Sequence, residues 1–306
     1  MLRSFFIALS ESRMLRALAE RSPMGRRASA RFVAGTTVES ALQATKVANA
    51  AGASITIDNL GENVTNVEEA KQSAQLYHDM LDAIAANKLD ANVSLKLTHM
   101  GLDVDEALAR KLVNEVVAHA ARLDSFVRID MEGSPYTQRT LDFVFALHRQ
   151  PGNAGRVGAV IQTYLRRSEA DVRALCAEGI RIRLCKGAYK EPADIAFQPK
   201  SEVDANFVKL TKIMLRSGVY HGVATHDPKM IDTTIAFARA EGIGPEKFEF
   251  QMLHGIRRDL QQQLVRDGWR LRVYLPFGTE WYPYFMRRLA ERPANVIFIL
   301  KNMLKP

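Results

Sequence analysis

The sequence predicts an α/β fold in which eight parallel strands and their helices close into a (βα)8 barrel. Eight short apolar runs alternate with helical patterns from residue 55 onward, which is the element order of a barrel or of a doubly wound sheet. No G-x-G-x-x-G sequence follows the first run, which argues against a dinucleotide-binding doubly wound sheet. With 306 residues, 47% of them hydrophobic, the chain is long enough to bury a large core.

The predicted strands are short runs, and in several of them apolar residues occupy nearly every position. Strands that are buried on both faces read this way, because helices cover one face and the barrel interior lies against the other. The runs are Ile55–Asp58, Val93–Leu97, Phe126–Met131, Gly158–Thr163, Ile180–Cys185, Gly222–Thr225, Phe248–Leu253 and Leu271–Leu275.

The predicted helices lie between these runs, and cap or turn residues mark their ends. The first helix opens after Asn66, a residue type that caps helix N-termini, with Glu68 and Glu69 in its first turn. Glycines such as Gly101 and Gly179 supply turns or helix ends. The expected helices are Val67–Ala85, Glu106–Ala121, Thr137–Leu147, Glu169–Glu178, Glu202–Ser217, Pro228–Glu241, Arg258–Asp267 and Trp281–Arg292.

The N-terminal segment, residues 1–33, is basic and has apolar residues at helical spacing. It carries seven arginines but only two acidic residues, Glu11 and Glu20. Such a stretch can be a mitochondrial transit peptide or a membrane-surface helix, but the two acids favour helices of the folded protein. No secretory signal pattern is present. We therefore expect N-terminal helices over residues 1–45, packed on a single barrel over residues 46–306 that includes the last helix.

The composition indicates which partners and which cellular compartment to expect. The formal charge of +8 comes from scattered Lys and Arg without a nucleic-acid motif, so we expect a solubilising surface and no nucleic-acid partner. Two cysteines cannot form a disulfide framework or a complete zinc site. They indicate a reducing compartment, and no run approaches the length of a transmembrane helix. A cytoplasmic location is predicted.

Charged and polar residues gather where the predicted strands end. In a (βα)8 barrel these carboxyl ends share one face, which carries the chemistry. Because a buried charge is costly unless it is paired or bound to a ligand, charges within or beside apolar strands predict an anionic cofactor or substrate. Those charges are Lys96, Asp130, Arg183 and Lys186. Other polar residues at strand ends are Asp58, Glu62, Gln162, Thr225, His226, Gln251 and Tyr274.

The last helix adds two adjacent arginines, Arg287 and Arg288, after aromatic residues that include Trp281 and Tyr284. Neighbouring helical residues diverge by about 100°, so the two arginines face different partners, whereas Arg287 and Glu291 share a face. Arg-Arg usually marks an exposed basic helix. Here the aromatic residues favour a position over the barrel mouth, where an arginine binds a carboxylate through two parallel hydrogen bonds.

On the residues alone, other functions stay open. Lys96 or Lys186 could form the Schiff base of a lyase. His226 and Asp227 could bind a metal in a hydrolase, although the other histidines lack ligand spacing. A basic scaffold that binds nucleic acid or membrane would need no chemistry at all.

Five motifs in order resemble the proline dehydrogenase family, in its monofunctional bacterial form. The resemblance runs from Arg31 to Pro293, nearly the whole chain, and the combination is far more specific than any one fragment. The motifs are Ser94–Thr98 (SLKLT), Arg128–Glu132 (RIDME), Arg183–Tyr189 (RLCKGAY), Ala224–Asp227 (ATHD) and Tyr284–Glu291 (YFMRRLAE).

The resemblance implies a distorted (βα)8 barrel of the TIM type with additional N-terminal helices. It implies a flavoenzyme that oxidises L-proline to Δ1-pyrroline-5-carboxylate by hydride transfer to FAD, the first step of proline catabolism. A membrane quinone is then the expected electron acceptor, and a separate pyrroline-5-carboxylate dehydrogenase takes the product. The basic N-terminal segment is compatible with peripheral contact at the inner face of the cell membrane.

The resemblance also assigns catalytic roles. Arg287 and Arg288 match a pair that grips the proline carboxylate, Asp130 matches a carboxylate close to substrate and flavin, and Arg183 matches an arginine near flavin N5. The residues that match the catalytic set are Lys96, Asp130, Arg183, Tyr274, Tyr284, Arg287 and Arg288.

Further matches concern the cofactor, a gate and substrate choice. Glu62 matches an acid that pairs with Arg288 and gates the pocket. Tyr274 stands where related hydroxyproline enzymes carry a smaller residue, so proline is the predicted substrate. Asn59 and His99 depart from the Leu and Gln that the family pattern leads us to expect, which puts the local packing in doubt. No metal is expected. The flavin-binding matches are Asp130, Gln162, Arg183, Lys186, Gly187, Ala188, Thr225, His226, Gln251 and Glu291.

Overall fold

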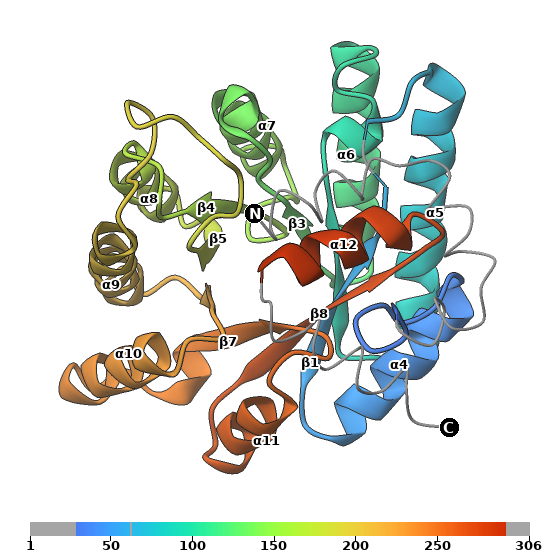
Figure 1. Cartoon of the computed structure of the whole chain (residues 1–306). Helices are drawn as coiled ribbons and strands as arrows, with labels where there is room; N and C mark the ends of the chain where they lie inside the picture. The colour runs from blue at the N-terminus through green and yellow to red at the C-terminus, as the bar shows by residue number, and fades with distance from the viewer. Residues whose placement is uncertain (1–28, 62, 292–306) are drawn as a thin grey trace.

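The computed structural model describes residues 29–61 and 63–291, with side chains through Met286. In this part of the chain eight parallel strands form a closed barrel, in which each strand bonds to the next and β8 bonds back to β1 (Figure 1). The predicted (βα)8 barrel is therefore confirmed. The strands are β1 (Ser54–Asn59), β2 (Ala91–Leu95), β3 (Val127–Ile129), β4 (Val157–Gln162), β5 (Arg181–Cys185), β6 (His221–Ala224), β7 (Phe248–Leu253) and β8 (Leu271–Phe277).

The helices follow the strands around the outside of the barrel (Figure 1). The predicted cap is present, because the Asn66 side chain accepts a hydrogen bond from the backbone N–H of Glu69 at 2.9 Å. The α-helices are α4 (Val38–Ala50), α5 (Val67–Ala86), α6 (Glu106–Arg122), α7 (Thr137–His148), α8 (Ser168–Ala177), α9 (Lys200–Arg216), α10 (Pro228–Ala240), α11 (Arg258–Arg266) and α12 (Trp281–Glu291), and the short 3-10 helices are η1 (Thr98–Met100), η2 (Ser134–Tyr136) and η3 (Pro245–Lys247).

Two strands end two residues earlier than the sequence predicts, and this changes where their polar residues lie. Strand β2 ends at Leu95, and Leu97, the residue that precedes η1, already has helical backbone angles. Strand β3 ends at Ile129, although the N–H of Asp130 still donates to the Leu95 carbonyl at 2.8 Å. Lys96 and Asp130 therefore lie just beyond their strands, at the barrel mouth.

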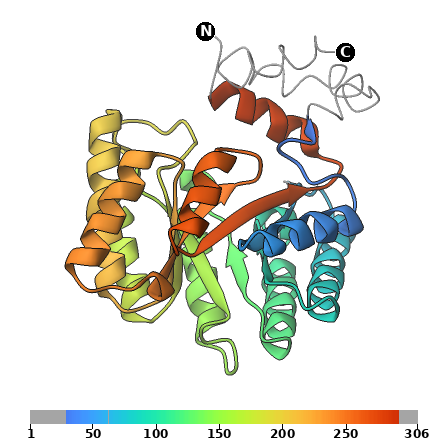
Figure 2. The ribbon, with the colours of Figure 1, turned by 90° about the horizontal axis from the view of Figure 1, so that it is seen from below.

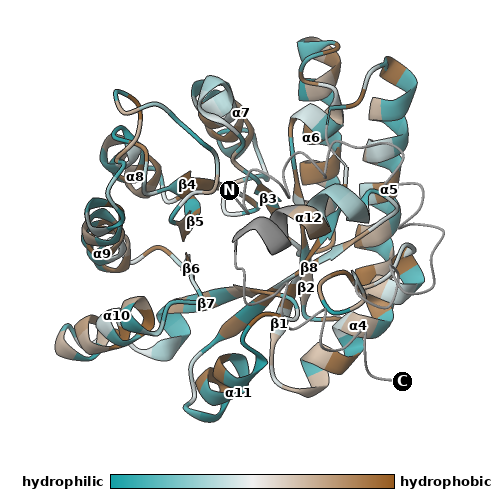
Figure 3. Cartoon of the chain, viewed as in Figure 1, coloured by the Kyte–Doolittle hydropathy of each residue, from teal (hydrophilic) through white to brown (hydrophobic). Residues whose placement is uncertain are grey.

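The hydrophobic core lies between the strands and the outer helices. In α6, for example, the buried residues Ala109, Val113, Val116 and Ala120 recur at spacings of three and four, which places them on one face of the helix. Hydrophilic and hydrophobic residues accordingly alternate along the outer helices in Figure 3.

The interior of the barrel is polar. Along β1, Ile55 and Ile57 alternate with Thr56 and Asp58, and all four are buried. Successive side chains of a strand point to opposite faces, so the polar pair faces inward: the Thr56 hydroxyl donates to the Asn92 side chain of β2 at 2.8 Å. The strands are buried on both faces, as predicted, and many of their inward residues are polar.

Helix α4 completes the outer layer and spans the expected domain boundary between residues 45 and 46. It packs against β1 and β8, and the Thr37 side chain caps its first turn by accepting from the N–H of Ser40 at 3.3 Å. The expected helices before residue 29 lie outside the described residues.

Helix α12 follows β8 and lies across the end of the barrel at which the strands finish (Figures 1 and 2). It is held by a second hydrophobic cluster, in which Phe285 lies near Phe32 and Trp281. The sequence expectation that the last helix covers the barrel mouth agrees with this position. No helix of the described residues is both long and apolar enough to cross a lipid bilayer.

Candidate active site

Four of the predicted site residues converge in one buried cluster at the carboxyl ends of the strands. The Arg183 guanidinium of β5 donates from Nη1 to Asp130 Oδ1 at 2.7 Å and from Nε to Gln251 Oε1 at 2.6 Å. The Tyr274 hydroxyl of β8 donates to Asp130 Oδ2 at 3.0 Å. Charge-assisted bonds of this kind are short and directional, so Arg183, Asp130, Gln251 and Tyr274 form one rigid unit.

Ser94, at the inner face of β2, completes this unit although it was predicted only as part of a motif. Its hydroxyl donates to Asp130 Oδ1 at 2.6 Å. The Asp130 carboxylate therefore accepts from three side chains. The Arg183 guanidinium also lies 5.0 Å from the centre of the Tyr274 ring, a favourable cation–π distance.

Lys96 lies beside this cluster and pairs with Asp58, which the sequence analysis did not include in the catalytic set. The Nζ atom lies 3.3 Å from Asp58 Oδ2. Burial raises the pKa of Asp58 to about 6; the Lys96 charge opposes this rise and the Asp130 charge adds to it. Asp58 interrupts an apolar strand just as Arg183 does, and that signal could have found it.

Tyr274 is a neutral donor. Burial, together with the nearby Asp130 and Asp58 carboxylates, raises its pKa well above the ordinary value. Its phenol therefore keeps its proton at physiological pH, and the bond to Asp130 fixes its orientation.

A second group of predicted residues lies at the ends of β4, β5 and β6. Gln162 donates from Nε2 to the carbonyls of Met131 and Glu132 at 3.2 and 3.1 Å. Its Oε1 is buried and has no hydrogen-bond partner among the described residues. His226 Nε2 accepts from the N–H of Leu253 at 2.9 Å, so this nitrogen is not available to a metal.

Lys186 follows β5 and forms ion pairs with two carboxylates. Its Nζ lies 2.6 Å from Asp204 Oδ1 and 2.8 Å from Asp227 Oδ2. Next to it, Gly187 has φ +107°, and a Cβ there would lie 2.2 Å from the Tyr164 ring. Only glycine fits at this position, which explains why it follows Lys186.

These residues fit a flavin. The buried acceptor of Gln162, the Arg183 and Lys186 cations and the exposed backbone at Gly187 and Ala188 surround one mouth. Such a set offers acceptors and cations to a ligand that carries both N–H groups and negative charge. Among the described residues, no group of three His, Cys, Asp or Glu side chains could hold a metal ion.

The remaining predicted residues belong to the gate and to the last helix. Glu62 and the side chains of Arg287, Arg288 and Glu291 lie outside the described residues. Tyr284 is described; it is buried in α12, within the cluster that holds this helix over the barrel.

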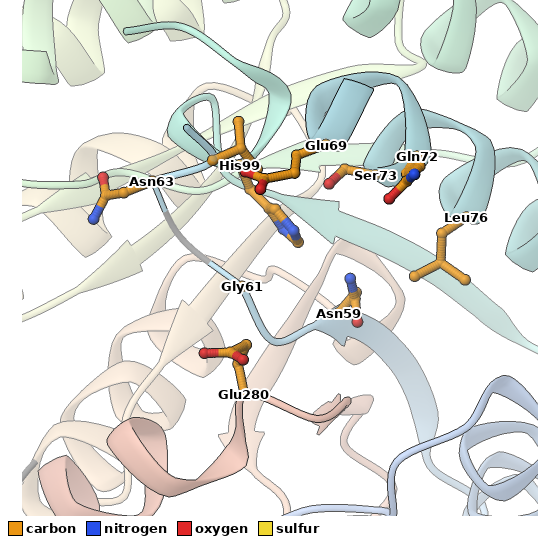
Figure 4. Close-up of a pocket in the computed structure, with 10 residues that line it drawn as sticks. Asn59, Gly61, Asn63, Glu69, Gln72, Ser73, Leu76, His99 and Glu280 are labelled. Atoms are coloured by element: carbon orange, nitrogen blue, oxygen red, sulfur yellow. The ribbon is translucent and has the colours of Figure 1, made fainter. Parts of the chain in front are cut away.

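A separate pocket of about 370 Å³ lies beside the site, between the end of β1 and helix α5 (Figure 4). Asn59 and His99, the two departures from the family pattern, both line it. The His99 ring packs so closely that a Cβ on Gly61 would lie 2.4 Å from it. Burial lowers the pKa of His99 to about 4, and the Lys96 charge adds to this. A glycine at position 61 accommodates the histidine.

Comparisons with known proteins bear on the family of this chain. The family model described as Proline dehydrogenase matches residues 41–301. Proline dehydrogenase 1 of Bacillus subtilis (strain 168) is 43% identical over 307 residues, which cover 100% of both chains. Proline dehydrogenase of Deinococcus radiodurans is 41% identical over 278 residues, covering 90% of this chain and 89% of that protein.

Larger proteins match only in part. The structure of proline utilization A (PutA) from Bdellovibrio bacteriovorus, inactivated by N-propargylglycine, superposes with a TM-score of 0.82 at 25% identity. That match covers 87% of this chain and 33% of the PutA chain. The matching family model, the full-length relatives and the barrel together show the family. The chain belongs to the proline dehydrogenase family of flavin-dependent oxidoreductases, which act in the first step of proline catabolism.

Proposed function

We propose that the protein oxidises L-proline to Δ1-pyrroline-5-carboxylate with FAD as the bound cofactor and a quinone-type electron acceptor. The observation that carries the proposal is the buried unit of Arg183, Asp130, Gln251 and Tyr274 at the barrel mouth. Its charges are fixed before any ligand binds, which is what electrostatic stabilisation of a transition state requires.

The oxidation removes a hydride from C5 and a proton from the ring nitrogen of proline, and a C=N bond forms. The nitrogen lone pair must be free, so the amine has to lose its ammonium proton first. Asp58, with its pKa raised to about 6, can accept that proton near the substrate. The Lys96 ammonium, 3.3 Å from Asp58 Oδ2, stabilises the carboxylate form that accepts it. Asp130 provides a fixed negative charge that favours the developing iminium cation.

Specificity and substrate binding rest on other residues. The Tyr274 ring is held between Arg183 and Asp130, so it cannot swing away to admit a 4-hydroxyl group. Arg287 and Arg288 remain the predicted clamp for the proline carboxylate, and Glu62 with Arg288 remains the predicted gate.

When bound, FAD supplies the acceptor for the hydride. Arg183 would stabilise the negative charge that reduction brings to the cofactor. Lys186 would bind it as a cation, and Gly187 would allow its close approach. The residues proposed to hold the cofactor are Asp130, Gln162, Arg183, Lys186, Gly187, Ala188, Thr225, His226, Gln251 and Glu291.

The proposal extends to partners. The electrons removed from proline would pass to a membrane quinone, and a separate pyrroline-5-carboxylate dehydrogenase would consume the product. The net charge of +8 favours peripheral contact with anionic lipid at the inner face of the cell membrane, with the protein otherwise in the cytoplasm. Residues 1–45 would pack on the catalytic barrel as N-terminal helices.

A visible absorption spectrum tests this proposal. The purified protein should show a flavin spectrum that anaerobic L-proline bleaches and 4-hydroxyproline bleaches poorly. Equal bleaching by both would refute the role of Tyr274. A flavin that neither compound reduces would remove proline as substrate, and a protein that binds no flavin after incubation with FAD would contradict the cofactor.

A further inference from the structure

A layer of charged and polar side chains lies inside the barrel beneath the candidate site. Glu249 of β7 and Arg272 of β8 form its centre, with Arg272 Nε 2.8 Å from Glu249 Oε1. Arg272 Nη1 also donates to the Ile55 carbonyl at 2.8 Å and to Asn92 Oδ1 at 3.0 Å. The Arg272 guanidinium is thus anchored to β1 and β2, on the side of β8 away from β7.

Glu249 links this layer to the site above it. Its Oε1 also accepts from Gln251 Nε2 at 2.6 Å, two residues farther along the same inward face of β7. Glu249 Oε2 accepts from the Tyr220 hydroxyl at 3.0 Å. Only 4% of Glu249 is exposed. Burial opposes ionisation, but the Arg272 charge and the hydrogen bonds from Arg272, Gln251 and Tyr220 together outweigh it, so the pKa of Glu249 is lowered from its ordinary value.

An ionised carboxylate can only accept hydrogen bonds. The amide of Gln251 must therefore turn its NH₂ group toward Glu249, and its oxygen points the other way. That oxygen is the atom that accepts from Arg183 Nε at 2.6 Å. Gly222 of β6 leaves room for this arrangement, because a Cβ there would lie 2.3 Å from Gln251 Nε2.

We propose that Glu249 is a positioning residue for the candidate active site: by accepting from Gln251 it fixes the amide orientation that aligns Arg183 with Asp130. The chain of bonds runs from the anchored Arg272 through Glu249, Gln251 and Arg183 to the Asp130 carboxylate. The inference rests on the proposed function in one respect, namely that the aligned Arg183 acts on a bound flavin.

A simpler role for Glu249 is to neutralise Arg272 and stabilise the barrel. Buried ion pairs contribute little net stability when both partners are compared with apolar residues, so stability alone is a weak reason for the pair. The two roles differ in what they require. Neutralising Arg272 requires the negative charge of Glu249. Orienting the Gln251 amide requires only an acceptor atom at the position of Oε1.

Three variants separate these roles. Glu249→Leu removes the acceptor, and Glu249→Gln keeps an acceptor oxygen but removes the charge. Asn92→Ala removes a different acceptor of Arg272 without touching Gln251. If Glu249→Leu is too unstable to purify, the double variant Glu249→Leu/Arg272→Met removes the unpaired charge and gives the same readout.

We expect Glu249→Leu to slow anaerobic reduction of the bound flavin by proline about tenfold, since small misalignments of a reacting group are costly. The midpoint potential of the flavin should shift as well. Glu249→Gln and Asn92→Ala should stay within about twofold of the parent rate. Loss of rate in all three variants, or in none, would overturn the positioning role.

A readout without proline or flavin separates this inference from the proposed function. The side-chain amide resonance of Gln251, identified by its loss in Gln251→Ala, should exchange slowly in the parent protein and in Glu249→Gln. It should exchange rapidly in Glu249→Leu. A rapidly exchanging amide in the parent protein would refute the bond to Glu249, whatever the substrate proves to be.

Discussion

At the scale of single residues, the site is organised around charges that are held in place by other charges. Asp130 accepts from Arg183, Ser94 and Tyr274, and Lys96 lies against the fully buried Asp58. A buried charge without such partners would cost several kcal/mol. These residues are therefore interdependent, and the change of one alters the protonation or orientation of the next.

Asp58 provides a prediction at this scale. Its pKa, raised to about 6, places a titration below neutral pH, so we expect flavin reduction by proline to accelerate as the pH rises through that value. Asp58→Asn should lower the rate and remove this step from the profile, because the amide cannot titrate. Stopped-flow measurement of the reduction rate at a series of pH values checks this.

The control is Ser54→Ala in the same strand, whose hydroxyl bonds to Asp90 at the far end of the barrel. It should leave the profile unchanged. A step near pH 6 that persists in Asp58→Asn would assign the titration to another group.

At the scale of elements, the loop between β5 and α9 combines an ion-pair network with a strained turn. Lys186 bridges Asp204 and Asp227, and Gly187 adopts a left-handed conformation directly against Tyr164. A side chain at position 187 has to displace the tyrosine ring or the loop. The loop that presents Lys186 therefore depends on a residue with no side chain.

Gly187→Ala should weaken FAD binding by at least about tenfold. The alanine would add backbone strain at a positive φ, and its Cβ would overlap with the Tyr164 ring. Gly179→Ala is the matched control: Gly179 also has a positive φ, of +72°, but nothing lies within 4 Å of the added Cβ. It should cost about 1 kcal/mol of stability and leave FAD affinity intact. Flavin fluorescence titration and thermal melts measure the two effects; equal FAD affinities would show that the loop tolerates a side chain.

At the scale of the whole molecule, buried neutral histidines make stability depend on pH. Burial lowers the pKa of His221 to about 3 and those of His99 and His254 to about 4, and neighbouring cations add to each shift. The His221 ring accepts from the Ile182 N–H at Nδ1 and contacts the Ser217 hydroxyl at Nε2, so it is bonded in its neutral form.

The sign of the effect follows from these lowered values. The unfolded chain takes up protons below about pH 6.5, whereas the folded chain does not. The stabilisation is therefore complete above that pH and is lost as the pH falls toward 4, by about 1.4 kcal/mol per unit for each histidine. Urea unfolding at pH 7.5 and at pH 5 should show the loss, and His221→Gln, which removes the titrating ring, should reduce it. An equal free energy of unfolding at both pH values would contradict the prediction.

The agreement between sequence and structure is close for local features. The cap at Asn66, the start of α5 at Val67 and the bounds of β7 match the expected positions, because capping and apolar spacing are properties of neighbouring residues. The strand-end residues Asp130, Arg183 and Gln251 lie together, with Lys96 beside them, as expected for strand ends of one barrel. The early ends of β2 and β3 were missed, since the turn into η1 involves contacts outside the strand.

By itself the sequence determined the order of strands and helices, the polar residues at the strand ends and, through its motifs, the family. Only the tertiary structure decided which polar groups are partners. Arg183 and Asp130 are 53 positions apart, and Arg272 and Asn92 are 180 apart. Glu249, set between two phenylalanines, gave no sign of the amide it orients. Closure of the barrel brings these side chains together, and their pairing depends on distances across its interior that no local pattern encodes.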